Sequence, residues 1–195
     1  MEELFRSANG PVAVDELSDA LSLFHQDAKM VCSLVSAAIA SKQLNLDAKI
    51  ESALQDAAEY LEFAPEANGP YYYEPDVDMV EVEGFEFLPI GQQGSLLLKP
   101  VDHDTDYLVA EALVRVILSV TTSFSFSVTD SIDRDEVPMG SASVSKPVKL
   151  VAKVFVTLYG DLANAPNVDS VEAEFERRSY HIDYGEVEPD WGYEE

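Results

Sequence analysis

The first third of the chain carries apolar residues at helical spacing. From residue 15 to about residue 63, apolar side chains recur three or four positions apart, as one face of a helix requires. A second helix is expected to begin near Asp47, after a short link at 41–46 that favours an antiparallel helical hairpin. Its inner face would be formed by Ile50, Ala53 or Leu54, Ala57 and Leu61. Pro65 and the Asn-Gly-Pro turn after it then end a helical region predicted over residues 1–68.

After Tyr73 the apolar residues alternate with polar ones, which is the pattern of β-strands. Valines alternate with glutamates at 80–83, and Gly84 lies where a kink or bulge would keep the alternation going. The longest strand candidate is Leu113–Thr129, in which serines and threonines occupy the alternate positions. The other face would carry Val120, Thr122, Phe124, Phe126 and Val128. This pattern predicts an antiparallel strand with one buried and one solvated face.

Two more strands are predicted, at Lys149–Tyr159 and Val168–Phe175. The apolar residues at 180, 182 and 184 have the opposite parity from Phe175, so a bulge or turn is expected near Arg177-Arg178. The predicted fold class is therefore α+β, with an N-terminal helical hairpin followed by a strongly bent antiparallel β-sheet or half-barrel. The expected division is a helical region at 1–68 and an antiparallel β domain with an acidic C-terminal tail at 69–195.

The charge of the chain limits its function, because 37 Asp and Glu residues outnumber 12 Lys and Arg residues, for a net charge of −25. A protein with this field does not release counterions from nucleic-acid phosphates, and an anionic membrane repels it. No basic residue occurs between Lys49 and Lys99. Three interpretations remain open: a solvated surface, a docking surface for a basic partner protein, and mimicry of nucleic-acid phosphates.

The C-terminal tail mixes acidic and aromatic residues. Its candidate partner-binding residues are Glu186, Glu188, Asp190, Trp191 and Tyr193, and Trp191 is the single tryptophan of the chain. Aromatic anchors within an acidic segment suit capture by a basic groove. The alternative is that Trp191 and Tyr193 fold back over an edge of the protein's own sheet.

The abundance of acidic residues makes metal binding a candidate chemistry. Asp102, Asp104 and Asp106 have the D-x-D-x-D opening of a calcium loop, and His103 could join them on a transition metal. The sixth and twelfth positions, which should be Gly and Glu, are Tyr107 and Leu113. The calcium-loop motif is therefore incomplete. Two interpretations of the cluster stay open, a metal site and a solvated loop.

Other catalytic chemistry finds little support. A second acidic loop with Asp130, Asp133 and Asp135 is expected to form a turn, since Asp side chains bond to nearby backbone groups. Cys32 is the single cysteine and lies in an apolar helical pattern, too far from His25 to pair with it. Phosphate-binding glycine motifs and a serine nucleophile elbow are absent. No cofactor is expected.

The stretch from Val77 to Tyr193 resembles a known type of domain. The Ser/Phe alternation into 129–133, the long strand Leu150–Tyr159 and the ending Tyr184–Asp190 are similar to the β-rich accessory domain downstream of some bacterial PIN-like domains. Residues 1–70 are too few and too helical for the PIN nuclease sheet, so no catalytic residue carries over. The resemblance implies a stand-alone sensing or partner-binding module in a toxin–antitoxin or phage-defence setting.

These observations favour a non-enzymatic acidic interaction protein that binds a basic partner protein, as an inhibitor or antitoxin does. The alternatives are a nucleic-acid mimic that inhibits a DNA-binding protein, and a metal-dependent hydrolase that uses Asp102, Asp104 and Asp106 with Asp130 or Asp133. The N-terminus lacks the features of a secretory signal, and no long apolar stretch occurs, so a cytoplasmic location is expected.

Overall fold

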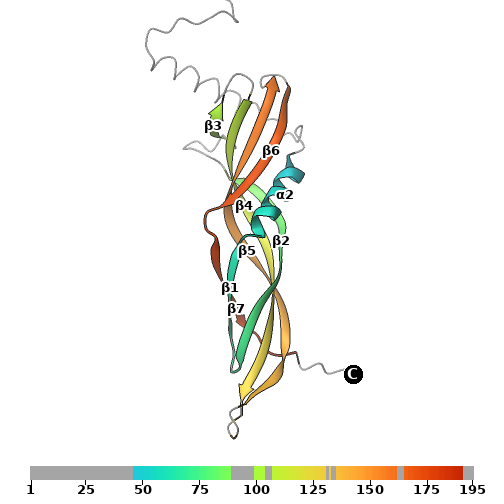
Figure 1. The fold of residues 1–195 in the computed structure, drawn as a ribbon, viewed down its shortest axis with the longest axis vertical. Coiled ribbons are helices and arrows are strands. Elements are labelled where there is room, and N and C mark those ends of the chain that lie inside the picture. The colour runs from blue at the N-terminus through green and yellow to red at the C-terminus, as the bar shows by residue number, and fades with distance from the viewer. Residues whose placement is uncertain are drawn as a thin grey trace, which may run out of the picture.

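The fold is mainly β (Figure 1). It is given by a computed structural model in which residues 46–88, 99–103, 107–130, 132, 135–161 and 165–190 are described. These residues form one helix, α2 (Asp47–Ala58), and the strands β1 (Glu62–Asn68), β2 (Tyr72–Leu88), β3 (Lys99–His103), β4 (Tyr107–Thr129), β5 (Glu136–Asp161), β6 (Ala165–Phe175) and β7 (Ser179–Glu186).

A long hairpin of β4 and β5 runs the length of the molecule (Figure 1). The two strands are 23 and 26 residues long, and at about 3.3 Å per residue β4 spans about 75 Å. At the turn, the N–H of Asp130 donates to the C=O of Asp135 at 2.9 Å. The N–H of Ile132 donates to Oδ1 of Asp130 at 2.8 Å. The acidic loop therefore has the turn role expected of it.

The remaining strands of this sheet flank different stretches of the hairpin. Strand β2 pairs with residues 113–127 of β4, and β3 pairs with residues 108–111. Strand β6 pairs with residues 152–161 of β5, at the end remote from the turn. Strands β1 and β7 form a separate two-stranded parallel sheet. The main sheet is consequently long and narrow.

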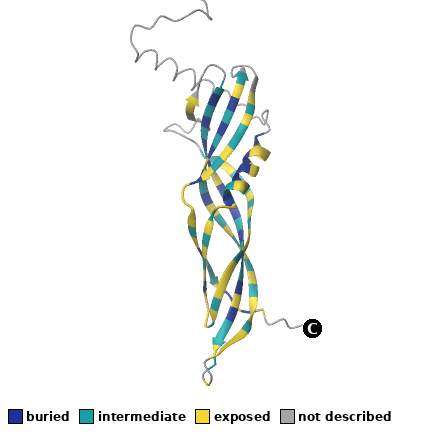
Figure 2. Ribbon diagram, viewed as in Figure 1, coloured by how far each residue is buried: buried dark blue, intermediate teal, exposed yellow. Residues whose placement is uncertain are grey.

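Alternation along β4 and β5 places one face of the hairpin in the core (Figure 2). The main cluster contains residues of α2 and of both strands: Leu46, Ile50, Leu54, Ala58, Leu108, Val114, Val116, Leu118, Val120, Ala152, Val154, Val156 and Leu158. A second cluster lies nearer the turn and contains Ala67, Phe124, Phe126 and Val187. The buried face predicted for the strand Leu113–Thr129 is thus confirmed on β4, including the burial of Thr122 among apolar neighbours.

The predicted α+β fold, a helical hairpin followed by a strongly bent sheet or half-barrel, is wrong. Among the described residues only α2 is helical, and the first predicted helix lies outside them. The helical pattern was expected to reach Phe63, but Glu62 already pairs with Ser179 in the β1–β7 sheet. The partner of β1 is β7, which lies far along the chain, so the periodicity of residues 62–68 alone does not reveal this pairing. No half-barrel forms, because the two edge strands β2 and β6 pair with different stretches of the hairpin and not with each other.

Several local expectations are confirmed. Helix α2 begins at Asp47, in a segment rich in strong helix formers, and its inner face buries Ile50 and Leu54. The register of β2 shifts between Val82 and Gly84, which is the expected bulge. Residues 176–178 lie between β6 and β7, where the parity change required a break.

Candidate binding surface

The acidic tail lies along the molecule with its carboxylates outward. Glu186 is the last residue of β7, and the side chains of Glu186, Glu188 and Asp190 are exposed. Trp191 and Tyr193, the aromatic anchors predicted for this tail, lie outside the described residues.

The alternate residues of the tail hold it against the sheet. Val187 and Pro189 are buried, and the N–H of Val187 donates to the C=O of Asn68 at 3.3 Å. The N–H of Asp190 donates to the C=O of Ser141 at 3.0 Å. Pro189 also lies over Gly140, whose φ of +114° suits glycine and whose missing Cβ would come within 3.5 Å of the proline ring. The tail up to Asp190 therefore follows a defined path.

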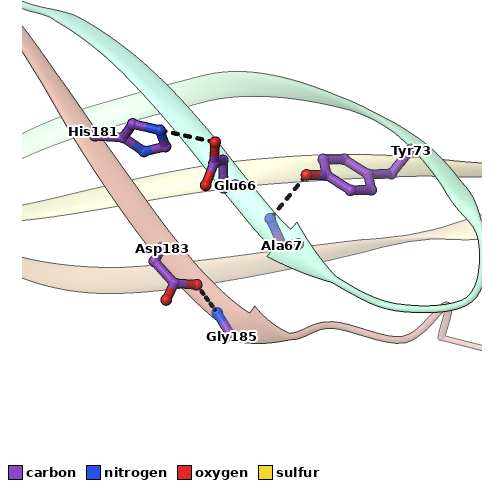
Figure 3. A network of polar contacts seen from close by, with 6 residues as sticks. All are labelled: Glu66, Ala67, Tyr73, His181, Asp183 and Gly185. Atoms are coloured by element: carbon purple, nitrogen blue, oxygen red, sulfur yellow. Dashed lines mark hydrogen bonds and ion pairs between the residues drawn. The ribbon is translucent and has the colours of Figure 1, made fainter.

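Polar contacts support the β1–β7 sheet from which this tail emerges (Figure 3). Nε2 of His181 lies 2.8 Å from a carboxylate oxygen of Glu66 on the neighbouring strand. The N–H of Ala67 donates to the hydroxyl of Tyr73 at 3.1 Å, which connects β1 to β2. The N–H of Gly185 donates to Oδ1 of Asp183 at 2.8 Å. Each of these groups bonds to a neighbouring residue of the fold, so their role is structural.

Of the predicted metal residues Asp102, Asp104 and Asp106, the structure describes Asp102. Asp102 is exposed on β3, and its Oδ2 accepts a hydrogen bond from the hydroxyl of Tyr107 at 2.9 Å. Asp104, Asp106 and Asp133 lie outside the described residues. Across the described ranges, no three His, Cys, Asp or Glu side chains are grouped closely enough to hold a metal ion. Cys32 and His25 also lie outside these ranges.

Helix α2 lies between the two edge strands β2 and β6 and bonds to both. The side-chain amide of Gln55 donates to the C=O of Val80 at 2.9 Å and accepts from the N–H of Val82 at 2.9 Å. On the other side, Nζ of Lys49 donates to the C=O of Val168 at 3.0 Å. A glutamine amide can donate and accept at once, as the backbone of a neighbouring strand would, and so Gln55 satisfies part of the β2 edge.

A groove of about 320 Å³ opens on the β2 side of α2. Its walls combine three carboxylates with two aromatic rings: Asp47, Glu51, Glu83, Gly84, Phe85 and Phe87. The rings of Phe85 and Phe87 are 5.7 Å apart between centroids and nearly perpendicular, at 80°. Carboxylates beside aromatic rings form a setting that suits a lysine or arginine side chain.

A second groove opens on the β6 side. It consists of two adjoining hollows of about 520 and 330 Å³, and Ala57, Tyr60 and Ala173 line both. Tyr60 is 82% exposed at the rim. We call α2 and these two grooves the α2 face. Its exposed carboxylates are Asp47, Glu51, Asp56, Glu62 and Glu83. Glu172 and Glu174 of β6, and Glu176 directly after it, border the same groove at the strand edge, but they alternate with the half-buried or buried residues of its floor, so their side chains lie on the outer face of β6.

The carboxylates of the α2 face are not neutralised by ion pairs. The ion pairs between described residues are Arg115–Glu86 and His181–Glu66, and neither includes a carboxylate of the α2 face. Two basic residues, Arg177 and Arg178, line one end of the groove on the β6 side. The negative field of this face is therefore left largely for solvent or for a partner.

Sequence reasoning did not find the α2 face, although one signal for it was present. The absence of any basic residue between Lys49 and Lys99 already marked α2 and β2 as acidic. The grooves could not be foreseen, because their walls come from α2, β2 and β6, whose proximity depends on the pairing of β2 and β6 with the hairpin.

The half-buried phenol of Tyr184 on β7 has a shifted pKa. Burial raises the pKa of the Tyr184 phenol above its usual 10.0, and a hydrogen bond with Thr122 opposes this in part. Tyr184 lies between the two core clusters and contacts both. Its role is structural.

The chain was compared with protein-family models, curated proteins and solved structures, and none of them matches. Within the described part of the chain, α2 is too short to span a membrane.

Proposed function

We propose that this chain is a non-enzymatic acidic binding protein whose α2 face docks a basic partner protein, as an inhibitor or antitoxin does. The observation that carries this proposal is the combination of unneutralised carboxylates and two grooves around a single helix. A uniformly solvated surface needs charge but no hollows. Charges gathered around concave surfaces focus the field and speed the approach of an oppositely charged partner.

The groove on the β2 side suits the basic side chains of such a partner. A lysine or arginine that enters it meets Asp47, Glu51 and Glu83 together with the rings of Phe85 and Phe87. A cation over an aromatic ring contributes roughly 0.5–2 kcal/mol, and adjacent carboxylates add Coulomb attraction. This groove would therefore contribute specificity as well as attraction.

The tail is proposed as a second contact. Its outward carboxylates Glu186, Glu188 and Asp190 add negative charge further along the hairpin, between α2 and the hairpin turn (Figure 1). The resemblance to the accessory domain of PIN-like proteins also supports this function, since it implies a stand-alone partner-binding module of a toxin–antitoxin or phage-defence system.

The proposal is tested by capturing partners from the native host with the tagged full chain at about 50 mM NaCl. A neutralised variant carries Asp47→Asn, Glu51→Gln and Glu83→Gln. A matched control loses the same number of exposed carboxylates near the hairpin turn, through Glu74→Gln, Asp76→Asn and Glu136→Gln. Captured proteins are identified by mass spectrometry and purified, and their affinity is measured against salt concentration.

We expect a partner with a net positive charge, whose affinity falls about tenfold in the neutralised variant and much less in the control. Capture of acidic proteins, or equal weakening in both variants, would contradict the proposal. Competition with duplex DNA separates the mimicry alternative: a captured partner that releases this protein when DNA is added uses its DNA-binding surface.

A further inference from the structure

The groove on the β6 side has an apolar floor that differs from the rest of the α2 face. The apolar residues of this floor come from α2, from the link after it and from β6: Ala53, Ala57, Leu61, Val171, Ala173 and Phe175. Ala57 and Ala173 line both hollows, and longer side chains at these two positions would take up space in them. Its hollows have the volumes of small ligand sites. The groove is thus able to receive an apolar side chain.

One wall of this groove is an open strand edge. Strand β6 is hydrogen-bonded to β5 on one side and has no strand neighbour on the other among the described strands. Helix α2 reaches this edge through the bond from Lys49 to Val168, beyond the part of β6 that lines the hollows. Open strand edges beside apolar pockets are where extended peptide segments bind.

The rim of the groove carries a charge pattern. Asp56 of α2 and Glu172 of β6 border the smaller hollow, which has no basic residue in its walls. The Glu172 side chain lies on the outer face of β6, where alternate side chains of an extended ligand would also point. The larger hollow is bordered by acids and, at its far end, by Arg177 and Arg178. Basic residues of a ligand are therefore attracted to the Asp56–Glu172 end and repelled from the arginine end.

We infer that the groove between α2 and β6 receives an extended segment of the basic partner, which inserts an apolar side chain between Ala57 and Ala173 and sets lysines or arginines against Asp56 and Glu172. This inference rests on the proposed function and names the place and mode of docking. A second copy of this chain is a poor occupant, because each copy has a net charge of −25 and would bring more acid to an acidic rim.

The test uses three fluorescently labelled octapeptides and the full-length protein. The first alternates lysine with valine or leucine, the second is all lysine, and the third replaces each lysine of the first with glutamate. We expect the alternating basic peptide to bind at least tenfold more tightly than oligolysine, because apolar burial adds to the charge attraction. The glutamate peptide should not bind.

Two variants locate the site. Ala173→Phe fills the groove and should reduce binding of the alternating peptide at least tenfold, whereas Ser143→Phe, on an exposed position of β5, should not. The rim pair Asp56→Asn with Glu172→Gln should weaken binding more than the control pair Glu74→Gln with Asp76→Asn. A photo-crosslinker at the central apolar position of the peptide should label α2 or β6 in the unmodified protein, which gives a readout even if Ala173→Phe fails to fold.

The outcomes separate the two proposals. If oligolysine binds as tightly as the alternating peptide, and the groove variants match their controls, the groove is not the docking site while the acidic docking function stands. If no basic peptide binds and no basic partner is captured, both are overturned. Crosslinks outside α2 and β6, or a dimer that Ala173→Phe dissociates, would also overturn the inference, the latter by showing a second copy in the groove.

Discussion

A hydrogen-bonded pair of hydroxyls, one on the fully buried Thr122 and one on the half-buried Tyr184, joins the two sheets. The hydroxyl of Tyr184 on β7 donates to the C=O of Val120 on β4 at 2.9 Å. It lies 2.8 Å from the hydroxyl of Thr122, which donates to it because the tyrosine proton is already used. Thr122 is fully buried, so water cannot replace this partner.

We expect Tyr184→Phe to lower the free energy of unfolding by roughly 1–3 kcal/mol, the cost of leaving the buried Thr122 hydroxyl unpaired. The ring contact with Phe124, 5.3 Å between centroids, is retained in this variant. Thr122→Val removes the other hydroxyl at nearly constant shape, and should cost about 1 kcal/mol because Tyr184 keeps its bond to Val120. The double variant leaves no unpaired hydroxyl, so its cost should be about 1 kcal/mol less than the sum.

Urea denaturation of the wild type, both single variants and the double variant measures these differences. Tyr72→Phe is the matched control, since Tyr72 is 71% exposed and its change should stay within about 0.5 kcal/mol. The reasoning fails if Tyr184→Phe is as stable as this control, or if the two single effects add without coupling.

Three further results are expected. Burial raises the pKa of Tyr184, so the unfolded chain loses the phenol proton at a lower pH than the folded chain, and the free energy of unfolding falls as pH rises above about 10. This fall should be smaller in Tyr184→Phe, and identical alkaline melting curves of the two proteins would contradict the prediction. Gln55→Leu should cost roughly 1–3 kcal/mol in chemical denaturation, and Gln55→Glu at least as much, since a carboxylate cannot donate to the C=O of Val80; a neutral Gln55→Leu would argue against the bridge to β2. The melting temperature should be higher in about 0.5 M than in 20 mM NaCl, because salt screens a net charge of −25; calorimetry that shows no salt effect would mean that the charges scarcely interact.

The local sequence pattern predicted an element correctly wherever buried and exposed positions alternate with the period of that helix or strand. The alternation at 120–128 assigned the buried and solvated sides of β4 correctly. The helical spacing after Asp47 located α2, and the parity change after Phe175 located the break before β7. In each case the prediction depends only on residues close together in the chain. It does not require knowing which other element covers the buried face.

The lengths of the strands were beyond local prediction. Strand β5 begins at Glu136, well before the predicted start at Lys149, through a stretch rich in Ser, Pro and Gly. That stretch is a strand because its residues pair with β4 up to Thr129–Glu136, apart from Met139, which lies at a register shift. Strand β1 likewise depends on β7, with which it pairs in parallel across more than half of the chain.

The candidate site shows the same division. Its chemistry could be read from the chain, since the run without basic residues after Lys49 predicts an acidic surface wherever those residues lie. Its shape could not, because the grooves exist only where α2 is held between β2 and β6 by Gln55 and Lys49. Charge is a property of each residue, whereas a groove is a property of elements that meet, and which strands meet is settled by pairing energies summed over the whole hairpin.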